Sequence, residues 1–180
     1  MRPVAEELAD RWIWWRIAHR EWGDPVDPSH AARQGGRWNP PDSFPTLYLN
    51  EDPVTARLNL RAFIAEWPYE PEDLRDDTGP QLVGATLPRS QWVCDAHSRA
   101  GIAALDLPKT YPLDGAGRTV TRERCQLIGV AVHGRGLRGV RARSAQSPDR
   151  AGRELAWFPA TARSRAKVVE TLPFGAWFWA

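Results

Sequence analysis

The segment GGRWNPP, residues 35–41, places an arginine and a tryptophan between a glycine pair and a proline pair. Glycine permits positive φ and a close approach of the backbone to a ligand, whereas proline fixes φ and ends regular structure. The segment therefore predicts a shaped loop in which Gly36, Arg37 and Trp38 grip an anion and a ring. The alternative is an ordinary turn with a half-buried Trp38 and a solvated Arg37.

A second candidate, Arg16, lies in WIWWRIAH, residues 12–19, which alternates as a β-strand does. Ile13, Trp15 and Ile17 share one face, so Arg16 lies on the other face among residues of the buried type. A buried guanidinium without an anionic partner is costly. We therefore expect Arg16 to face either a ligand phosphate or a nearby carboxylate.

The elements that would position these residues are separated by prolines and glycines. Asp52 followed by Pro53 is typical of a helix start, and this helix should reach residue 66. A proline in the first turn favours a helix over residues 3–11. Other helices are expected over 99–105 and from 121, other strands over 46–50, 81–87, 140–143, 154–159 and 166–172, and an irregular excursion over 88–120. This mixture predicts an α+β fold in a single domain, residues 1–180.

Composition narrows the function classes. The net charge of +2 argues against direct nucleic-acid binding, although the arginine cluster RGLRGVRARS leaves a nucleic-acid module as an alternative. Two cysteines without a CxxC pair predict neither a disulfide framework nor a zinc site. No apolar run approaches the ~20 residues of a membrane span, and the acidic start does not resemble a signal peptide. We expect a cytoplasmic protein that does not bind membranes.

The histidines predict no metal site, because their spacing does not suit metal ligands. We interpret all of them as surface or internally satisfied residues, and only His19 is expected near the candidate cleft. They are His19, His30, His97 and His133.

Taken in order, WWRIAH, GGRWNPP, TLYLNEDPVTA, CQLIGVAV and GVRARSA resemble the RES domain family over residues 12–145. The resemblance implies a fold related to ADP-ribosyltransferases, with NAD as the substrate and no metal. Its nicotinamide–ribose bond would be cleaved by hydrolysis or phosphorolysis, or its ADP-ribose transferred to a protein. The resemblance further implies a toxin, with a helix-turn-helix antitoxin as partner and inorganic phosphate as a possible ligand. A homo-oligomer is also possible.

Several residues take roles from this resemblance. Arg16 and Arg37 match the family arginines that hold the phosphates and ribose of NAD, a task suited to planar, permanently charged guanidinium groups. Tyr48 is similar to the family tyrosine that stacks on nicotinamide or binds the ribose. Ser144 matches the family serine, which holds substrate or incoming phosphate. Without the family, Tyr48 is equally explained by sheet packing, and Ser144 alone carries almost no signal.

One position departs from the family. Asn59 stands where the family has a glutamate, which stabilises the positive charge that grows on the ribose as nicotinamide leaves. Asparagine keeps a hydrogen bond without the charge, and losing one such group commonly costs about 10²–10³ in rate. Glu51, Glu66 or Glu154 could compensate, and Glu154 is the best placed of these. The alternative function is a catalytically silent protein that binds NAD or another nucleotide.

Overall fold

The computed structural model describes residues 2–68, 70–147, 151–161 and 163–180, and it has the predicted α+β fold. The strands are β1 Ala5–Glu7, β2 Trp14–Ala18, β3 Leu47–Asn50, β4 Gln81–Thr86, β5 Trp92–Ala96, β6 Gly139–Arg143, β7 Arg153–Trp157 and β8 Lys167–Leu172. The helices are α1 Ser29–Gln34, α2 Pro53–Ile64, α3 Arg99–Ala104, α4 Arg122–Gly134 and α5 Phe174–Phe178, with a 3₁₀ turn over Pro71–Asp73.

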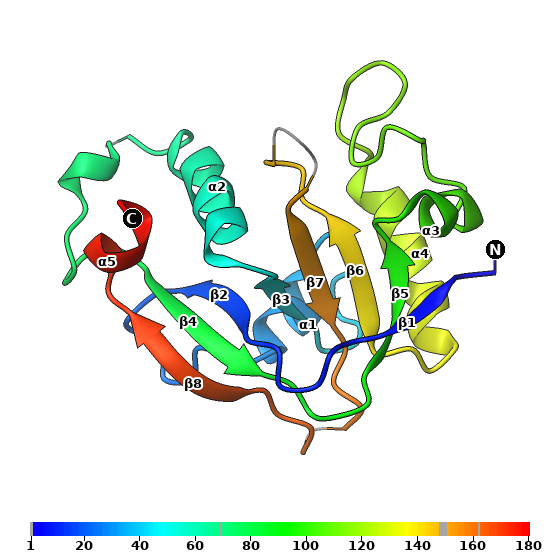
Figure 1. Cartoon of the computed structure of the whole chain (residues 1–180), viewed down its shortest axis with the longest axis horizontal. Coiled ribbons are helices and arrows are strands. Elements are labelled where there is room, and N and C mark those ends of the chain that lie inside the picture. The colour runs from blue at the N-terminus through cyan, green and yellow to red at the C-terminus, as the bar shows by residue number, and fades with distance from the viewer. Residues whose placement is uncertain (1, 69, 148–150, 162) are drawn as a thin grey trace.

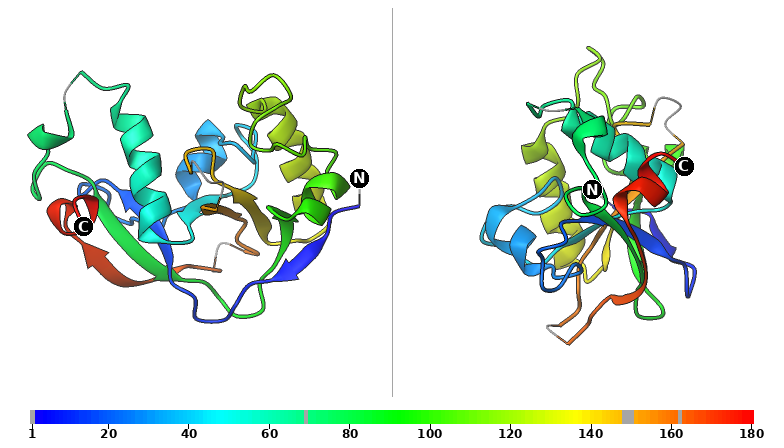
Figure 2. Two further views of the ribbon diagram at one scale, coloured as in Figure 1. Left: turned by 45° about the horizontal axis from the view of Figure 1, so that its top comes forward. Right: turned by 90° about the vertical axis from the view of Figure 1, so that its left-hand side faces the viewer.

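All described strands belong to one sheet, in the order β1-β5-β6-β7-β3-β2-β4-β8. The pairing is antiparallel except between β5 and β6. Helices α2 and α5 pack against β2 and β4, whereas α3 and α4 pack against β5 and β6 (Figure 1). Figure 2 shows that the sheet is curved, with α2 and α4 on its concave side near opposite ends.

The sheet is weakest between β2 and β3. These strands share a single register pair, Trp15 with Asn50, whereas β2 and β4 pair continuously from Trp14 to Ala18. Strands β2 and β3 therefore diverge on one side of this pair. Side chains from both can point into the gap, which is where the candidate site lies.

Three hydrophobic clusters hold the sheet and helices together. One contains Trp38 and Tyr111 and joins α3 and α4 to β5, β6 and β7. A second contains Trp14 and Trp157 and packs around the central strands. The third lies beneath α2 and α5 around Trp177. Trp38 belongs to the first cluster and is 2% exposed, so it anchors the 35–41 loop in the core and is not half-buried.

The helix predicted over residues 3–11 is wrong, because this segment forms β1. Ala5, Glu6 and Glu7 pair antiparallel with β5, opposite Cys94, Val93 and Trp92. The prediction rested on the proline near the start of this segment, which is a local signal. The edge of β5 offers backbone hydrogen-bond partners that exist only in the folded chain. Strand pairing therefore overrides the helical preference here.

Besides β1 and the 3₁₀ turn, three elements were not predicted from the sequence. Strand β5 lies inside the segment expected to be irregular, and α1 and α5 were missed. Helix α1 is short, has no side-chain cap and contains no buried residue, so it has neither a start signal nor an apolar stripe. By contrast, the start of α2 is confirmed, because the Asp52 carboxylate accepts the Thr55 N–H at 2.7 Å.

Among the described residues, no helix is long and apolar enough for a membrane crossing.

Asp95, at the end of β5, sets up α3 and gives a pH-dependent prediction. Its Oδ1 accepts the N–H groups of His97 and Ser98, each at 2.8 Å. Burial raises the pKa of Asp95, but these bonds and the Ser98 hydroxyl outweigh it, so the pKa lies below its usual value. A lowered carboxylate pKa stabilises the fold above the unfolded pKa, and this stability is lost as pH falls through the folded pKa.

We expect Asp95→Asn to lower the free energy of unfolding by about 1–3 kcal/mol at neutral pH, because a charged acceptor is lost. Urea unfolding followed by tryptophan fluorescence measures this difference in unfolding free energy, which should narrow as the pH falls through the lowered pKa of Asp95. The exposed Asp77, changed to Asn, is the matched control. An equal effect of Asp95→Asn at all pH values would contradict the prediction.

Candidate functional site

A cavity of about 260 Å³ opens where β2 and β3 diverge. It brings together four residues predicted from the sequence: Arg16 of β2, Tyr48 of β3, Asn59 of α2 and Glu154 of β7. The rest of its lining consists of Ile17, Trp22, Leu49 and Asn50. The cavity thus combines one cation, one carboxylate, two amides and two aromatic rings, groups able to bind a polar, charged ligand that carries a ring.

Asn59 lies at the centre of a hydrogen-bond network at this cavity. Its Nδ2 donates to Asn50 Oδ1 at 2.7 Å and to Glu154 Oε1 at 2.9 Å. Its Oδ1 accepts the Ser144 hydroxyl at 3.0 Å. Both amide hydrogens are therefore used inside the protein. Asn59 orients Glu154, which places a carboxylate of β7 beside α2.

The other two acids proposed as replacements for the family glutamate lie elsewhere. Glu51 forms an ion pair with Arg141, and Glu66 is exposed beyond the end of α2. Neither lines the cavity with Asn59.

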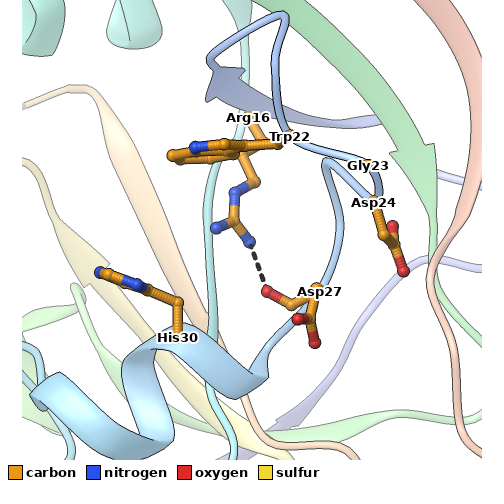
Figure 3. Close-up of a pocket in the computed structure, with 6 residues that line it drawn as sticks. All are labelled: Arg16, Trp22, Gly23, Asp24, Asp27 and His30. Atoms are coloured by element: carbon orange, nitrogen blue, oxygen red, sulfur yellow. Dashed lines mark hydrogen bonds between the residues drawn. The ribbon is translucent and has the colours of Figure 1, made fainter.

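Arg16 is largely desolvated without a direct carboxylate contact among the described residues. Its guanidinium carbon lies 5.3 Å from the centre of the Trp22 ring, and Nη1 makes a long 3.5 Å contact with the Asp27 carbonyl oxygen (Figure 3). Burial lowers the pKa of Arg16 to about 10, although Asp27 and Asp24 partly offset this. Arg16 remains a cation at neutral pH, and its incomplete pairing suits an anionic ligand.

A second cavity, of about 230 Å³, adjoins the first and shares Arg16 and Trp22 with it. His30 of α1 also lines this cavity, and Figure 3 shows the space between the Trp22 and His30 rings beside the Arg16 guanidinium. The expectation that only His19 lies near the cleft is therefore wrong. The fold of the loop before α1 brings His30 there, and no strand or helix pattern encodes that placement.

Tyr48 connects the cavity to the 35–41 loop. Its hydroxyl accepts the Trp38 N–H and donates to Asn39 Oδ1, each at 2.8 Å. Burial raises the pKa of Tyr48 well above its usual value, so the phenol stays protonated. Helix α4 holds the loop from the other side, where Gln126 Nε2 donates to the Gly36 carbonyl at 2.9 Å.

Gly36 serves this packing. A Cβ at this position would come within 2.5 Å of the Tyr48 ring carbons Cε2 and Cζ. The sequence predicted an approach of the glycine backbone to a ligand, but the close approach in the structure is to the tyrosine. Gly36 therefore keeps Tyr48 in place at the wall of the cavity.

We expect Gly36→Ala to lower the free energy of unfolding by about 1–3 kcal/mol, because the ring must shift in a packed surrounding. Gly23→Ala is the matched control, since a Cβ there meets nothing within 4 Å. Chemical denaturation of both variants tests this, and equal stability of the two would contradict the role given to Gly36.

Arg37 does not line the cavity that contains Arg16. Its Nη1 donates to the Val120 carbonyl at 3.1 Å and contacts Cys125 Sγ at 3.6 Å. Burial lowers the pKa of Arg37, but Tyr111, Cys125 and Glu154 outweigh it and the pKa is raised. Burial raises the pKa of both Tyr111 and Cys125, so these two groups stay protonated at neutral pH. Arg37 is thus within the electrostatic reach of the site.

Ser144 is fully buried and does not line the cavity either. Its hydroxyl donates to Asn59 and accepts the Gln146 N–H at 3.2 Å. In this structure Ser144 acts on the cavity through Asn59.

Sequence reasoning missed Trp22 and Asn50. Trp22 lies in a loop, and nothing in its neighbours indicates that its ring covers Arg16. Asn50 did carry a signal in the sequence, because it is a polar residue at the end of the otherwise apolar segment LYLN. In the structure it is only 7% exposed. Its Nδ2 donates to the Trp15 carbonyl at 3.1 Å, at the one point where β2 and β3 meet.

Among the described residues, one cluster has the composition of a metal site: Glu6, Asp95 and His97. Its groups already have partners, since His97 Nε2 lies 3.0 Å from Glu6 Oε1 and Arg141 Nη1 lies 3.1 Å from Glu6 Oε2. A guanidinium at this distance disfavours a second cation. The arrangement is an ion-pair network beside β5.

The fold and the cavity define a class. The chain belongs to the RES domain family, whose model matches residues 13–176. This match extends beyond the segments recognised in the sequence and includes β7 and β8. Among solved structures, the chain is similar to one in the crystal structure of the M. tuberculosis MbcT–MbcA toxin–antitoxin complex. The two share 18% identity at a TM-score of 0.75, over 98% of this chain and 92% of that chain. This likeness establishes a common fold. No curated protein matches the chain.

Proposed function

We propose that this protein binds NAD between β2 and β3 and cleaves its nicotinamide–ribose bond. The observation that carries the proposal is the convergence of Arg16, Tyr48 and Glu154 on one cavity, with Asn59 holding the Glu154 carboxylate. The resemblance to the RES family implies NAD as the substrate. The adjoining cavity that shares Arg16 and Trp22 offers room for the second half of a dinucleotide.

In the proposed reaction the C–N bond breaks and its electron pair leaves with nicotinamide, which departs as a neutral molecule. Positive charge grows on the ribose, where Glu154 stabilises it as a fixed anion in a partly desolvated site. Water or inorganic phosphate then bonds to the same carbon, and a water nucleophile loses its proton to solvent. Arg16 would hold the pyrophosphate, because its charge lacks a direct carboxylate partner among the described residues.

The remaining predicted residues take supporting roles in this proposal. Tyr48 would form the wall against which nicotinamide or ribose rests, and Arg37 would add positive potential from the far side of that wall. Gly36, Trp38 and Ser144 would position these groups without touching the substrate, since each has its close contacts within the protein.

A catalytically silent nucleotide-binding protein is the second candidate. It is favoured by Asn59, whose amide hydrogens are both taken by protein acceptors and are not free for a ribose hydroxyl. This alternative keeps Arg16 and both cavities but gives Glu154 only a structural role.

One assay separates the two. Purified protein is incubated with NAD, with and without inorganic phosphate, and the released nicotinamide and the ADP-ribose product are quantified. Release of nicotinamide supports the enzyme, and the product identifies water or phosphate as the acceptor. NAD binding without release favours the silent protein. Absence of both binding and release would overturn the proposal.

We further propose that the protein is the toxin of a toxin–antitoxin pair, neutralised by an antitoxin with a helix-turn-helix domain. Support comes from the family and from the solved complex of the similar MbcT chain with MbcA. Expression of the chain alone should arrest growth, and co-expression of the protein from a neighbouring reading frame should relieve the arrest. Unimpaired growth at high expression would argue against a toxin.

A further inference from the structure

A third cavity, of about 380 Å³, lies at the edge of α3 and shares no lining residue with the two cavities described above. It is lined by Arg99, Ile102, Ala103, Lys109 and Arg143. These residues come from α3, the loop after it and the last position of β6. The volume falls within the range of about 300–1,000 Å³ that is typical of small-molecule sites.

The charge of this cavity has one sign. Three of its lining residues are cations and none is an acid. Over the part of the chain that the structure describes, Arg99, Lys109 and Arg143 form no ion pair with a carboxylate. Like charges gathered around one concavity repel each other, and an anion between them would relieve that repulsion.

Arg143 is the fixed member of this set. Its Nε donates to the His97 carbonyl at 2.7 Å and its Nη1 to the Tyr111 carbonyl at 3.2 Å. Carbonyl groups orient the guanidinium but do not neutralise it, and Nη2 has no partner among the described residues. The charge is therefore held in place before any ligand arrives, which reduces the entropy that binding must overcome.

Arg99 and Lys109 are exposed and line the cavity with cationic side chains. Ile102 and Ala103 add an apolar part to the lining. The combination suits a ligand with a compact, doubly charged anion on a small apolar body. A phosphomonoester has this form, and its oxygens match guanidinium forks in geometry.

We propose that this cavity binds a phosphomonoester, with Arg143 as the fixed contact and Arg99 and Lys109 as closing contacts. The site is independent of the proposed NAD site and does not require that the protein cleave NAD. Arg143 directly precedes Ser144, whose hydroxyl donates to Asn59 at the proposed NAD site.

Phenyl phosphate is the probe, because it joins a dianionic phosphate to a small ring. Its binding to the whole protein is measured by isothermal titration calorimetry, with phenol as the uncharged comparison. The double variant R99A/K109A should weaken phenyl phosphate binding at least about tenfold, since two charged contacts are lost. R89A/K167A is the matched control, because it removes the same two residue types from exposed positions elsewhere.

The expected pattern is binding of phenyl phosphate but not phenol, loss in R99A/K109A, and no change in R89A/K167A or Arg16→Ala. Arg16→Ala separates the two sites, because it should affect NAD and not phenyl phosphate. Equal weakening in both double variants, loss of binding in Arg16→Ala, or no binding to the unmodified protein would each overturn the proposal. Binding of an acidic peptide without phenyl phosphate binding would also overturn it and assign the surface to a macromolecule.

Discussion

Replacing Glu154 by glutamine should reduce NAD turnover by about 10²–10³-fold, the usual cost of losing one preorganised electrostatic group. The glutamine carbonyl oxygen can still accept the Asn59 amide hydrogen that now reaches Glu154 Oε1 at 2.9 Å. The change therefore removes the charge and leaves the hydrogen-bond network in place. NAD affinity and the free energy of unfolding should change little, and nicotinamide release measures the loss.

Glu66→Gln is the matched control for this experiment. Glu66 was an alternative source of the missing carboxylate, but it is exposed beyond the end of α2 and does not line the cavity. Its substitution should leave turnover unchanged. Full activity of Glu154→Gln would rule out the role that we propose for Glu154, and a loss confined to Glu66→Gln would assign that role to Glu66.

The contacts of Asn59 also predict how the family residue would behave in this chain. A glutamate at position 59 would place a carboxylate beside Glu154 Oε1 and Asn50 Oδ1, where the Asn59 amide now donates. Two anions at this distance repel each other, and two acceptors would lose their donor. Asn59 and Glu154 are therefore a matched pair, and placing a carboxylate at position 59 requires a change at both positions.

Sequence patterns predicted the elements that carry local signals. The Asp-Pro start of α2, the alternation in β2 and the strand that carries Tyr48 were all found, and these elements hold Asn59, Arg16 and Tyr48. Arg16 was singled out by its place in an alternating strand, whereas Tyr48 and Asn59 took their roles from the resemblance to the RES family. Glu154 was preferred among three acids because a strand residue that follows Ser144 could line the same cleft.

The features that sequence analysis could not predict depend on contacts between residues far apart in the chain. The divergence of β2 from β3 depends on which strands pair, and β1 pairs with β5, which lies far from it in the sequence. Trp22 and His30 reach Arg16 only because a loop folds back over it, as Figure 3 shows. The separation of Arg37 from the Arg16 cavity likewise follows from the contacts of the loop with α4. No periodicity within one element encodes these placements.

The two arginines should therefore respond differently to the same substitution. Arg16→Met keeps most of the apolar stem and removes a desolvated charge that has no ion-pair partner among the described residues. Replacing such a charge by an apolar group is often neutral or stabilising, by up to about 1–4 kcal/mol. We expect the free energy of unfolding to be unchanged or higher, while NAD affinity falls about 100-fold with the loss of charge-assisted contacts.

Arg37→Met should behave in the opposite way, because the Arg37 guanidinium has its own partners at the Val120 carbonyl and Cys125 Sγ. Its loss leaves a buried acceptor without a donor and should cost about 1–3 kcal/mol of unfolding free energy. Denaturation and NAD titration of both variants separate a residue kept for its ligand from one kept for the fold. A marked loss of stability in Arg16→Met with unchanged NAD affinity would show that Arg16 serves the fold. The proposal that the cavity between β2 and β3 binds the phosphates of NAD would then lose its main support.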